Sequence, residues 1–199
     1  MSRFAAFVAL ESCLLVATRV AWAQSSVSPA AGFPAGAIHL LTEPDHLLAI
    51  LALALLAGQV GRRALLWTPA GLSAGLLVGA LSGVALPPLQ QVEAVNLASI
   101  AILGAVVALG APLPVAVPGV LALLFGWGHG YANVLDIGGK TPPLAYVLGV
   151  TAAALVVVIS VSTATSFLRV RWQEIAVRAV GSWICVIGSM AFALWFAGD

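Results

Sequence analysis

Long apolar runs separated by short polar breaks make up most of the chain. Six such runs lie at about residues 36–58, 65–86, 93–111, 115–133, 144–166 and 177–197. About 20 predominantly apolar residues suffice for one α-helical membrane crossing. The runs are continuously apolar, whereas the strands of a membrane β-barrel alternate apolar and polar side chains. The pattern therefore predicts an all-α membrane protein with six transmembrane helices.

The first residues, MSRFAAFVALESCLLVATRVAWAQ, have a different pattern. A basic start precedes an apolar centre, and Ala-Trp-Ala at residues 21–23 is a small-x-small cleavage signal. We interpret residues 1–23 as a cleaved signal peptide, residues 24–35 as a periplasmic linker and residues 36–199 as the six-helix transmembrane domain. Because Glu11 and Arg19 are unusual in a signal peptide, an uncleaved anchor helix is the alternative.

The composition agrees with a membrane location. Hydrophobic residues make up 62% of the 199 residues and charged residues only 8%, whereas roughly a quarter of the residues are charged in soluble domains. The net charge of +1 gives no reason to expect a nucleic-acid partner. Cys13 lies in the predicted signal peptide and Cys185 in an apolar run, so we expect neither a disulfide nor a thiolate metal site.

The positions of the basic residues predict the orientation. Short cytoplasmic loops carry an excess of Lys and Arg. With the mature N-terminus outside, Lys140 is the one basic residue of the outer side. The loops of the inner side then hold Arg62, Arg63, Arg169, Arg171 and Arg178. We therefore expect both ends of the mature chain on the outer side of the membrane.

The second apolar run carries a glycine at every fourth position. Gly71, Gly75, Gly79 and Gly83 form a stripe of small residues on one helix face. Such stripes allow close approach of another helix in lipid. Tight packing inside one subunit and a homo-oligomer contact both fit this stripe.

Ionisable residues gather where the runs reach the outer side. They are His39, Glu43, Asp45 and His46 at the start of the first run, Glu93 at the start of the third and His129 near the end of the fourth. Ionisable groups within a membrane span are costly and usually mark a binding site or a pathway. All three histidines of the chain are among them. The six residues therefore predict one outward-facing polar site.

The first run is expected to be broken near Thr42. Thr42, Pro44 and Asp45 are typical of a helix start, with Thr42 as N-cap, a proline in the first turn and an acid at the third position. A continuous helix would separate His39 and His46 by roughly 10.5 Å along its axis, too far for one metal ion. A bend at Thr42 would bring His39 back toward His46.

Helical spacing adds two asparagines to the site. Asn96 follows Glu93 by three residues and Asn133 follows His129 by four, so each pair shares a helix face. Imidazoles and carboxylates are the ligands expected for a borderline divalent ion such as Ni²⁺, Co²⁺ or Zn²⁺. We predict the metal ligands His39, Asp45, His46, Glu93 and His129, supported by Glu43, Asn96 and Asn133. The alternative role for Asp45 is to orient His46 through a hydrogen bond.

The same residues resemble a known family. The stretch HLLTEPDH at residues 39–46 is similar to the first-helix motif HxxxGxDH of the HupE/UreJ family of nickel and cobalt permeases. VEAVNLASIAILG in the third run resembles the acid-led helix of that family, and HGYAN at residues 129–133 its later histidine-glycine motif. Glu43 replaces the glycine of the first motif, and Tyr131 and Asn133 stand where many members have further histidines.

This resemblance implies uptake of Ni²⁺ or Co²⁺ across the bacterial inner membrane, alongside hydrogenase or urease maturation. The sequence contains no Walker motif, so we expect a secondary permease that is not an enzyme. The divalent metal is its transported substrate, and no prosthetic group is expected. Two alternatives stay open. One is an intramembrane hydrolase in which the histidines hold Zn²⁺ and an acid activates water. The other is a metal-binding accessory subunit without transport of its own.

Overall fold

The computed structural model describes residues 32–135, 137 and 143–198, and in these residues the chain forms helices and no strand. The all-α prediction is confirmed for this part. The helices are α2 (Phe33–Thr42), α3 (Pro44–Val60), α4 (Ala64–Ala85), α5 (Gln91–Leu109), α6 (Val117–Leu135), α7 (Pro143–Ser166) and α8 (Arg171–Gly198). The predicted signal peptide lies outside the described residues, as does the linker up to residue 31. Helix α2 begins at Phe33, within the range predicted as linker.

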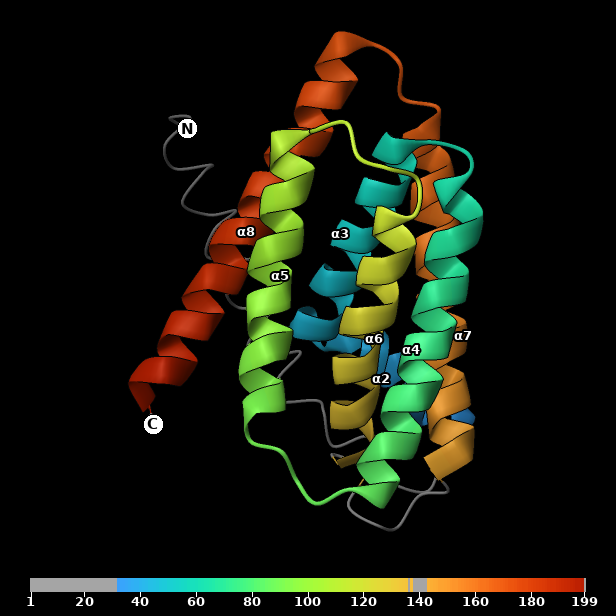
Figure 1. Ribbon diagram of the computed structural model, residues 1–199, viewed down its shortest axis with the longest axis vertical. Helices are drawn as coiled ribbons and strands as arrows, with labels where there is room; N and C mark the ends of the chain where they lie inside the picture. Colours follow the sequence, from blue (N-terminus) through green and yellow to red (C-terminus); the bar gives the residue numbers. More distant parts are fainter. Residues whose placement is uncertain (1–31, 136, 138–142, 199) are drawn as a thin grey trace, which may run out of the picture.

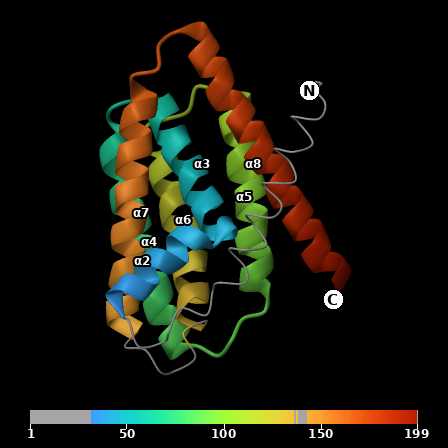
Figure 2. The ribbon, with the colours of Figure 1, turned by 180° about the vertical axis from the view of Figure 1, so that it is seen from behind.

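The long helices stand side by side in an upright bundle (Figure 1). The connections α3–α4, α5–α6 and α7–α8 lie together at its upper end, and the α4–α5 connection lies at the lower end. Figure 2 shows α2 lying obliquely across the lower half of the bundle, with its junction to α3 about midway along the height. Helix α3 is enclosed by the other helices, and every residue from Ala52 to Gly58 is buried.

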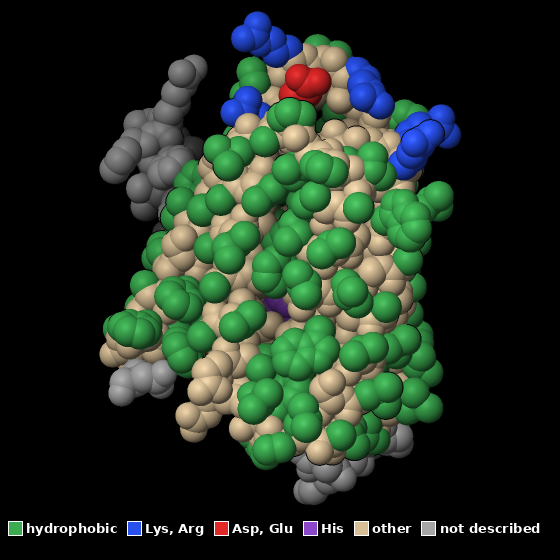
Figure 3. All heavy atoms as spheres, in the orientation of Figure 1, with side chains coloured by type: hydrophobic (Ala, Val, Ile, Leu, Met, Phe, Trp, Pro, Cys, Tyr) green, Lys and Arg blue, Asp and Glu red, His purple; other side chains and the backbone are tan. Residues whose placement is uncertain are grey.

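All five arginines of the predicted inner loops lie at the upper end, which we call the arginine end (residues 61–63, 110–116 and 167–178). Figure 3 shows the basic side chains gathered there around an acidic one, while the flanks of the molecule are covered by hydrophobic side chains. Lys140, the basic residue predicted on the other side, lies outside the described residues. The arginines thus share one end, as the sequence predicts.

Four described helices, α4, α5, α7 and α8, are long and apolar enough to cross a membrane. Helices α2 and α3 pass the same test as a pair that is bent by 79°, which gives up to five spans. Helix α6 is not among them, because its second half carries three glycines together with His129 and Asn133. The six predicted crossings are therefore matched only in part: every apolar run is helical, but four or five meet the requirements of a span.

The glycine stripe of α4 packs against α6 of the same chain. A Cβ atom built on Gly71, Gly75 or Gly79 would collide with a backbone oxygen of α6. Gly130 of α6 lies equally close to the backbone of Leu76 in α4. Packing inside the subunit is thus confirmed, since α6 fills the stripe, and a homo-oligomer contact stays a prediction.

Glycines also fix the oblique position of α2. A Cβ atom on Gly36 would collide with the backbone oxygen of Tyr146 in α7, and one on Gly149 of α7 would collide with that of Phe33. The two helices therefore cross at backbone contact. His39 lies in the turn after Gly36, so this crossing sets where its imidazole enters the bundle.

Candidate metal site

The break between α2 and α3 is at Glu43, one residue after the predicted position. Glu43 is extended, with φ −89° and ψ 111°, because the residue before a proline is disfavoured in the helical conformation. Pro44 then occupies the first turn of α3, where its missing N–H removes no helical hydrogen bond. The prediction that Thr42 caps the second helix is wrong, since its hydroxyl donates backward to the carbonyl of Ile38 at 2.9 Å.

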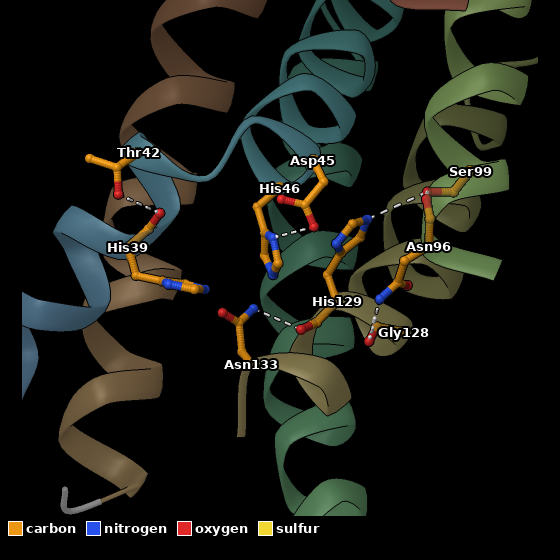
Figure 4. A network of polar contacts seen from close by, with 9 residues as sticks. All are labelled: His39, Thr42, Asp45, His46, Asn96, Ser99, Gly128, His129 and Asn133. Carbon is orange, nitrogen blue, oxygen red and sulfur yellow. Dashed lines mark hydrogen bonds and ion pairs between the residues drawn. The ribbon is translucent and has the colours of Figure 1, made fainter. Parts of the chain in front are cut away.

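The break brings three imidazoles together from three helices (Figure 4). The ring centroids of His39 and His46 are 5.1 Å apart, and those of His46 and His129 are 5.0 Å apart. Two imidazoles bound to one tetrahedral ion through bonds of about 2.1 Å have centroids about 5 Å apart. His46 and His129 are buried and His39 is half-buried. His46 therefore lies at the spacing of a shared-ion ligand from each of the other two rings.

The cluster is not a closed metal centre. Across the described ranges, no three His, Cys, Asp or Glu side chains are already arranged to hold an ion. The Nδ1 atom of His129 is buried without a hydrogen-bond partner in these ranges. The Asn133 amide points toward the His39 ring (Figure 4). Buried polar atoms of this kind call for an explanation, such as a bound water or ion.

Asp45 contacts His46 directly. Its Oδ2 atom lies 2.9 Å from Nδ1 of His46, and Figure 4 shows the carboxylate between the rings of His46 and His129. A carboxylate on the second nitrogen of a metal-binding histidine fixes the ring and raises its basicity. Of the two roles expected for Asp45, this contact favours the orientation of His46.

Ser99 of α5 is a polar contact that the sequence pattern did not single out. Its hydroxyl donates to the carbonyl of Asn96 at 2.6 Å and lies 3.4 Å from Nε2 of His129. A hydroxyl has one proton to donate, so we infer that Ser99 accepts from His129 and that the ring proton sits on Nε2. Nδ1 of His129 then keeps its lone pair for an ion. The signal in the sequence was the position of Ser99 three residues after Asn96, on the same helix face.

The two predicted asparagines hold the backbone of α6 around His129. Asn96 donates to the carbonyl of Gly128 at 3.1 Å, and Asn133 donates to the carbonyl of His129 at 2.7 Å. A Cβ atom on Gly128 would collide with the Asn96 amide oxygen, so a larger residue there would displace the Asn96 side chain. Both asparagines are buried. The Asn133 amide faces the His39 ring, whereas the Asn96 amide lies against Gly128 (Figure 4).

The two glutamates lie outside the histidine cluster. Glu93 is exposed on the first turn of α5, and it lines a pocket of about 320 Å³ together with Asp45 and His46. We call this the histidine-side pocket. Glu43 is half-buried at the break, where its N–H donates to the carbonyl of His39 at 2.9 Å. The structure thus brings together four of the five predicted ligands and places Glu93 in the wall of the histidine-side pocket.

The site lies deeper than the sequence suggested. Figure 3 shows histidine surface at the bottom of an opening about midway along the molecule. The predicted position was the outer mouth of the first run, but the oblique α2 carries His39 and the break into the middle of the bundle (Figure 2). Residues of the α4–α5 connection, including Pro88 and Gln90, line the histidine-side pocket. The pocket therefore extends from the middle of the bundle toward the end opposite the arginine end.

Comparison with known proteins gives one match. A family model described as HupE / UreJ protein matches residues 12–191. This range contains every residue predicted for the site. No curated protein and no solved structure matches the chain.

Proposed function

The chain belongs to the HupE / UreJ protein family, and from this membership and the histidine cluster we propose that it is a secondary permease for a divalent transition-metal ion, Ni²⁺ or Co²⁺. The observation that carries the proposal is the meeting of His39, His46 and His129 inside a bundle of apolar helices. Polar groups at membrane depth are costly. A bound cation that three imidazoles share would offset this cost.

The donor set supports a borderline metal ion. Imidazole nitrogens suit Ni²⁺, Co²⁺ and Zn²⁺, whereas Mg²⁺ prefers an all-oxygen site and Cu(I) prefers sulfur. The cluster provides three imidazoles, the carboxylate of Asp45 and the amide oxygen of Asn133. Because the ligands are not closed around an ion beforehand, binding requires rotation of the rings. A transporter needs such a site, since the ion must also leave it.

The arginines and the histidine-side pocket support a direction of entry. Positive charge marks the cytoplasmic side of a membrane protein, so the arginine end would face the cytoplasm and both termini the periplasm of a bacterial inner membrane. The exposed carboxylate of Glu93 in the opposite pocket wall would then attract periplasmic cations. Asp45 and His46 line the same pocket and would receive the ion.

The family comprises transport and accessory proteins, so a role beside a hydrogenase or urease maturation system is part of the proposal. The arrangement gives little support to a hydrolase. Zinc hydrolases place an acid where it can activate the metal-bound water. Here Asp45 is engaged with His46, and Glu93 is exposed on the first turn of α5. An accessory subunit differs from a permease only in lacking ion flux, which a direct measurement resolves.

The test is Ni²⁺ uptake into liposomes that contain the purified full chain, combined with equilibrium Ni²⁺ binding in detergent. We expect uptake by the wild type, and loss of both binding and uptake in His46→Ala and His129→Ala. Thr68→Ala, which removes a buried polar group in α4, is the control that keeps both. Binding without uptake by the wild type would identify an accessory protein. Wild-type binding in both histidine variants would refute the site.

A further inference from the structure

A second pocket lies at the arginine end. It has a volume of about 630 Å³ and is formed by the ends of α3, α5 and α7 and the first two turns of α8. We call it the arginine pocket. No residue of the proposed metal site lines it. Its function is therefore a separate question from that of the histidines.

The arginine pocket is strongly positive. Arg169, Arg171 and Arg178 line it with a single acid, Glu174, so its net charge is +2 from three positive charges and one negative charge. In the described part of the chain, none of these arginines forms an ion pair with an acid. Figure 3 shows the basic side chains at this end projecting around the acidic one. The pocket thus has positive charge that no group of the described chain neutralises.

Part of the pocket wall is fixed by hydrogen bonds to the last turn of α5. Arg178 donates from Nε to the carbonyl of Ala108 at 2.8 Å, and Gln59 donates from Nε2 to the carbonyl of Val107 at 3.1 Å. These bonds occupy carbonyls that would otherwise repel an anion. A guanidinium has five N–H donors, so Arg178 keeps its Nη groups for a ligand.

The remaining wall is apolar and lies at the level of a membrane surface. Leu113, Leu168 and Ile175 line the pocket beside the arginines. Phe167 and Trp172, which flank Leu168 and Arg171, are exposed to 76% and 67%. Exposed aromatic residues at helix ends are typical of the membrane–water interface. The pocket therefore combines cationic and apolar surfaces where lipid headgroups meet acyl chains.

We propose that the arginine pocket binds a phosphate group, that of an anionic lipid headgroup or of free phosphate. Arginine forks recognise phosphate through paired, charge-assisted hydrogen bonds. Basic pockets between membrane helices on the cytoplasmic side bind anionic headgroups, and about 630 Å³ lies within the usual range of ligand pockets. The proposal does not depend on metal transport, because it rests on other residues.

The test uses the purified full chain in neutral detergent. Binding of phosphatidylglycerol and of phosphatidylcholine is measured by native mass spectrometry, with inorganic phosphate as competitor. The pocket variant is Arg169→Gln with Arg171→Gln, and Arg178 is kept because it holds α5. The control variant is Arg62→Gln with Arg63→Gln, which makes the same charge change at the same end outside the pocket lining.

We expect phosphatidylglycerol to bind at least about tenfold more tightly than phosphatidylcholine, because charged hydrogen bonds are the strong ones. The pocket variant should lose at least about tenfold in affinity, and the control variant less than about twofold. If inorganic phosphate competes with phosphatidylglycerol, free phosphate is a ligand of the pocket. If it does not compete, the lipid headgroup is the ligand. Equal binding of both lipids without phosphate binding, or an equal loss in the control, would overturn the proposal. Thermal unfolding without ligand verifies that both variants are folded.

Discussion

The histidine-side pocket and the arginine pocket differ in the sign of the charge that they present and in its depth. The first leads to imidazoles and a carboxylate in the middle of the bundle, and the second is lined by guanidinium groups at helix ends. Charge at membrane depth must be paired or functional, whereas charge at a helix end is hydrated. The proposed cation ligands are thus a small buried set of side chains. The arginines proposed to bind an anion are exposed at helix ends.

The largest expected effect is on the central ligand of the histidine cluster. His46 contacts both other imidazoles and Asp45. Loss of a group that only supports a ligand lowers metal affinity by roughly 10- to 100-fold. Loss of the ligand itself should therefore lower metal affinity by more than about 100-fold. We expect this weakening of Ni²⁺ binding in His46→Ala, measured by competition with a metal chelator. Phosphatidylglycerol binding should stay unchanged, and a parallel loss of both would show that the two pockets are not independent.

A smaller effect is expected from Asp45→Asn. The variant keeps the size of the side chain but removes the negative charge 2.9 Å from His46 Nδ1. We expect Ni²⁺ affinity to fall by roughly 10- to 100-fold while the thermal unfolding midpoint changes little. An unchanged affinity in the same chelator competition would exclude an orienting role for Asp45.

Glu93 and Glu174 are exposed acids, one in the lining of each pocket, so their substitutions can be compared directly. Glu93→Gln removes an acid from the histidine-side pocket, and Glu174→Gln removes one from the arginine pocket. Exposed charges act mainly through screened attraction, so each change should be about two- to fivefold. We expect Glu93→Gln to slow Ni²⁺ uptake at low salt and Glu174→Gln to tighten phosphatidylglycerol binding. Slower Ni²⁺ uptake in Glu174→Gln would contradict the assignment of opposite ligands to the two pockets.

The smallest effect is expected at Ser99, whose hydroxyl fixes the protonated nitrogen of His129. Removing one hydrogen bond in Ser99→Ala should weaken Ni²⁺ binding by about threefold, and Ser99→Thr, which keeps the hydroxyl, should restore it. Nitrogen NMR of the His129 ring measures the same effect directly. A ring that already carries its proton on Nδ1 in the wild type would refute the inferred tautomer.

The sequence predicted the histidine cluster well for a physical reason. Polar side chains in apolar helices are costly unless they contact one another. His39, His46 and His129 were therefore expected to lie close together. The proline at residue 44 also predicted the break, within one residue of its position. The break follows from a local rule, and the meeting of the histidines follows from the cost of leaving polar groups alone among apolar helices.

Other features depended on packing that a single sequence does not reveal. The depth of the site follows from the close crossing of α2 and α7 at Gly36 and Gly149, and nothing in the apolar pattern distinguished these glycines from others. Whether the α4 stripe met α6 or a second subunit was open for the same reason. Ser99 was missed because serines in membrane helices commonly bond to their own backbone, which Ser99 also does.

The interruption at Glu43 has an electrostatic consequence for any ion in the bundle. Helix α2 ends and α3 begins beside the imidazoles, so backbone dipoles terminate there, with about half a negative charge from α2 and half a positive charge from α3. Asp45 lies in the first turn of α3 and opposes the positive terminus. The carbonyl terminus of α2 remains as a permanent attraction for cations. An unbroken helix would carry its dipole ends to the membrane surfaces instead.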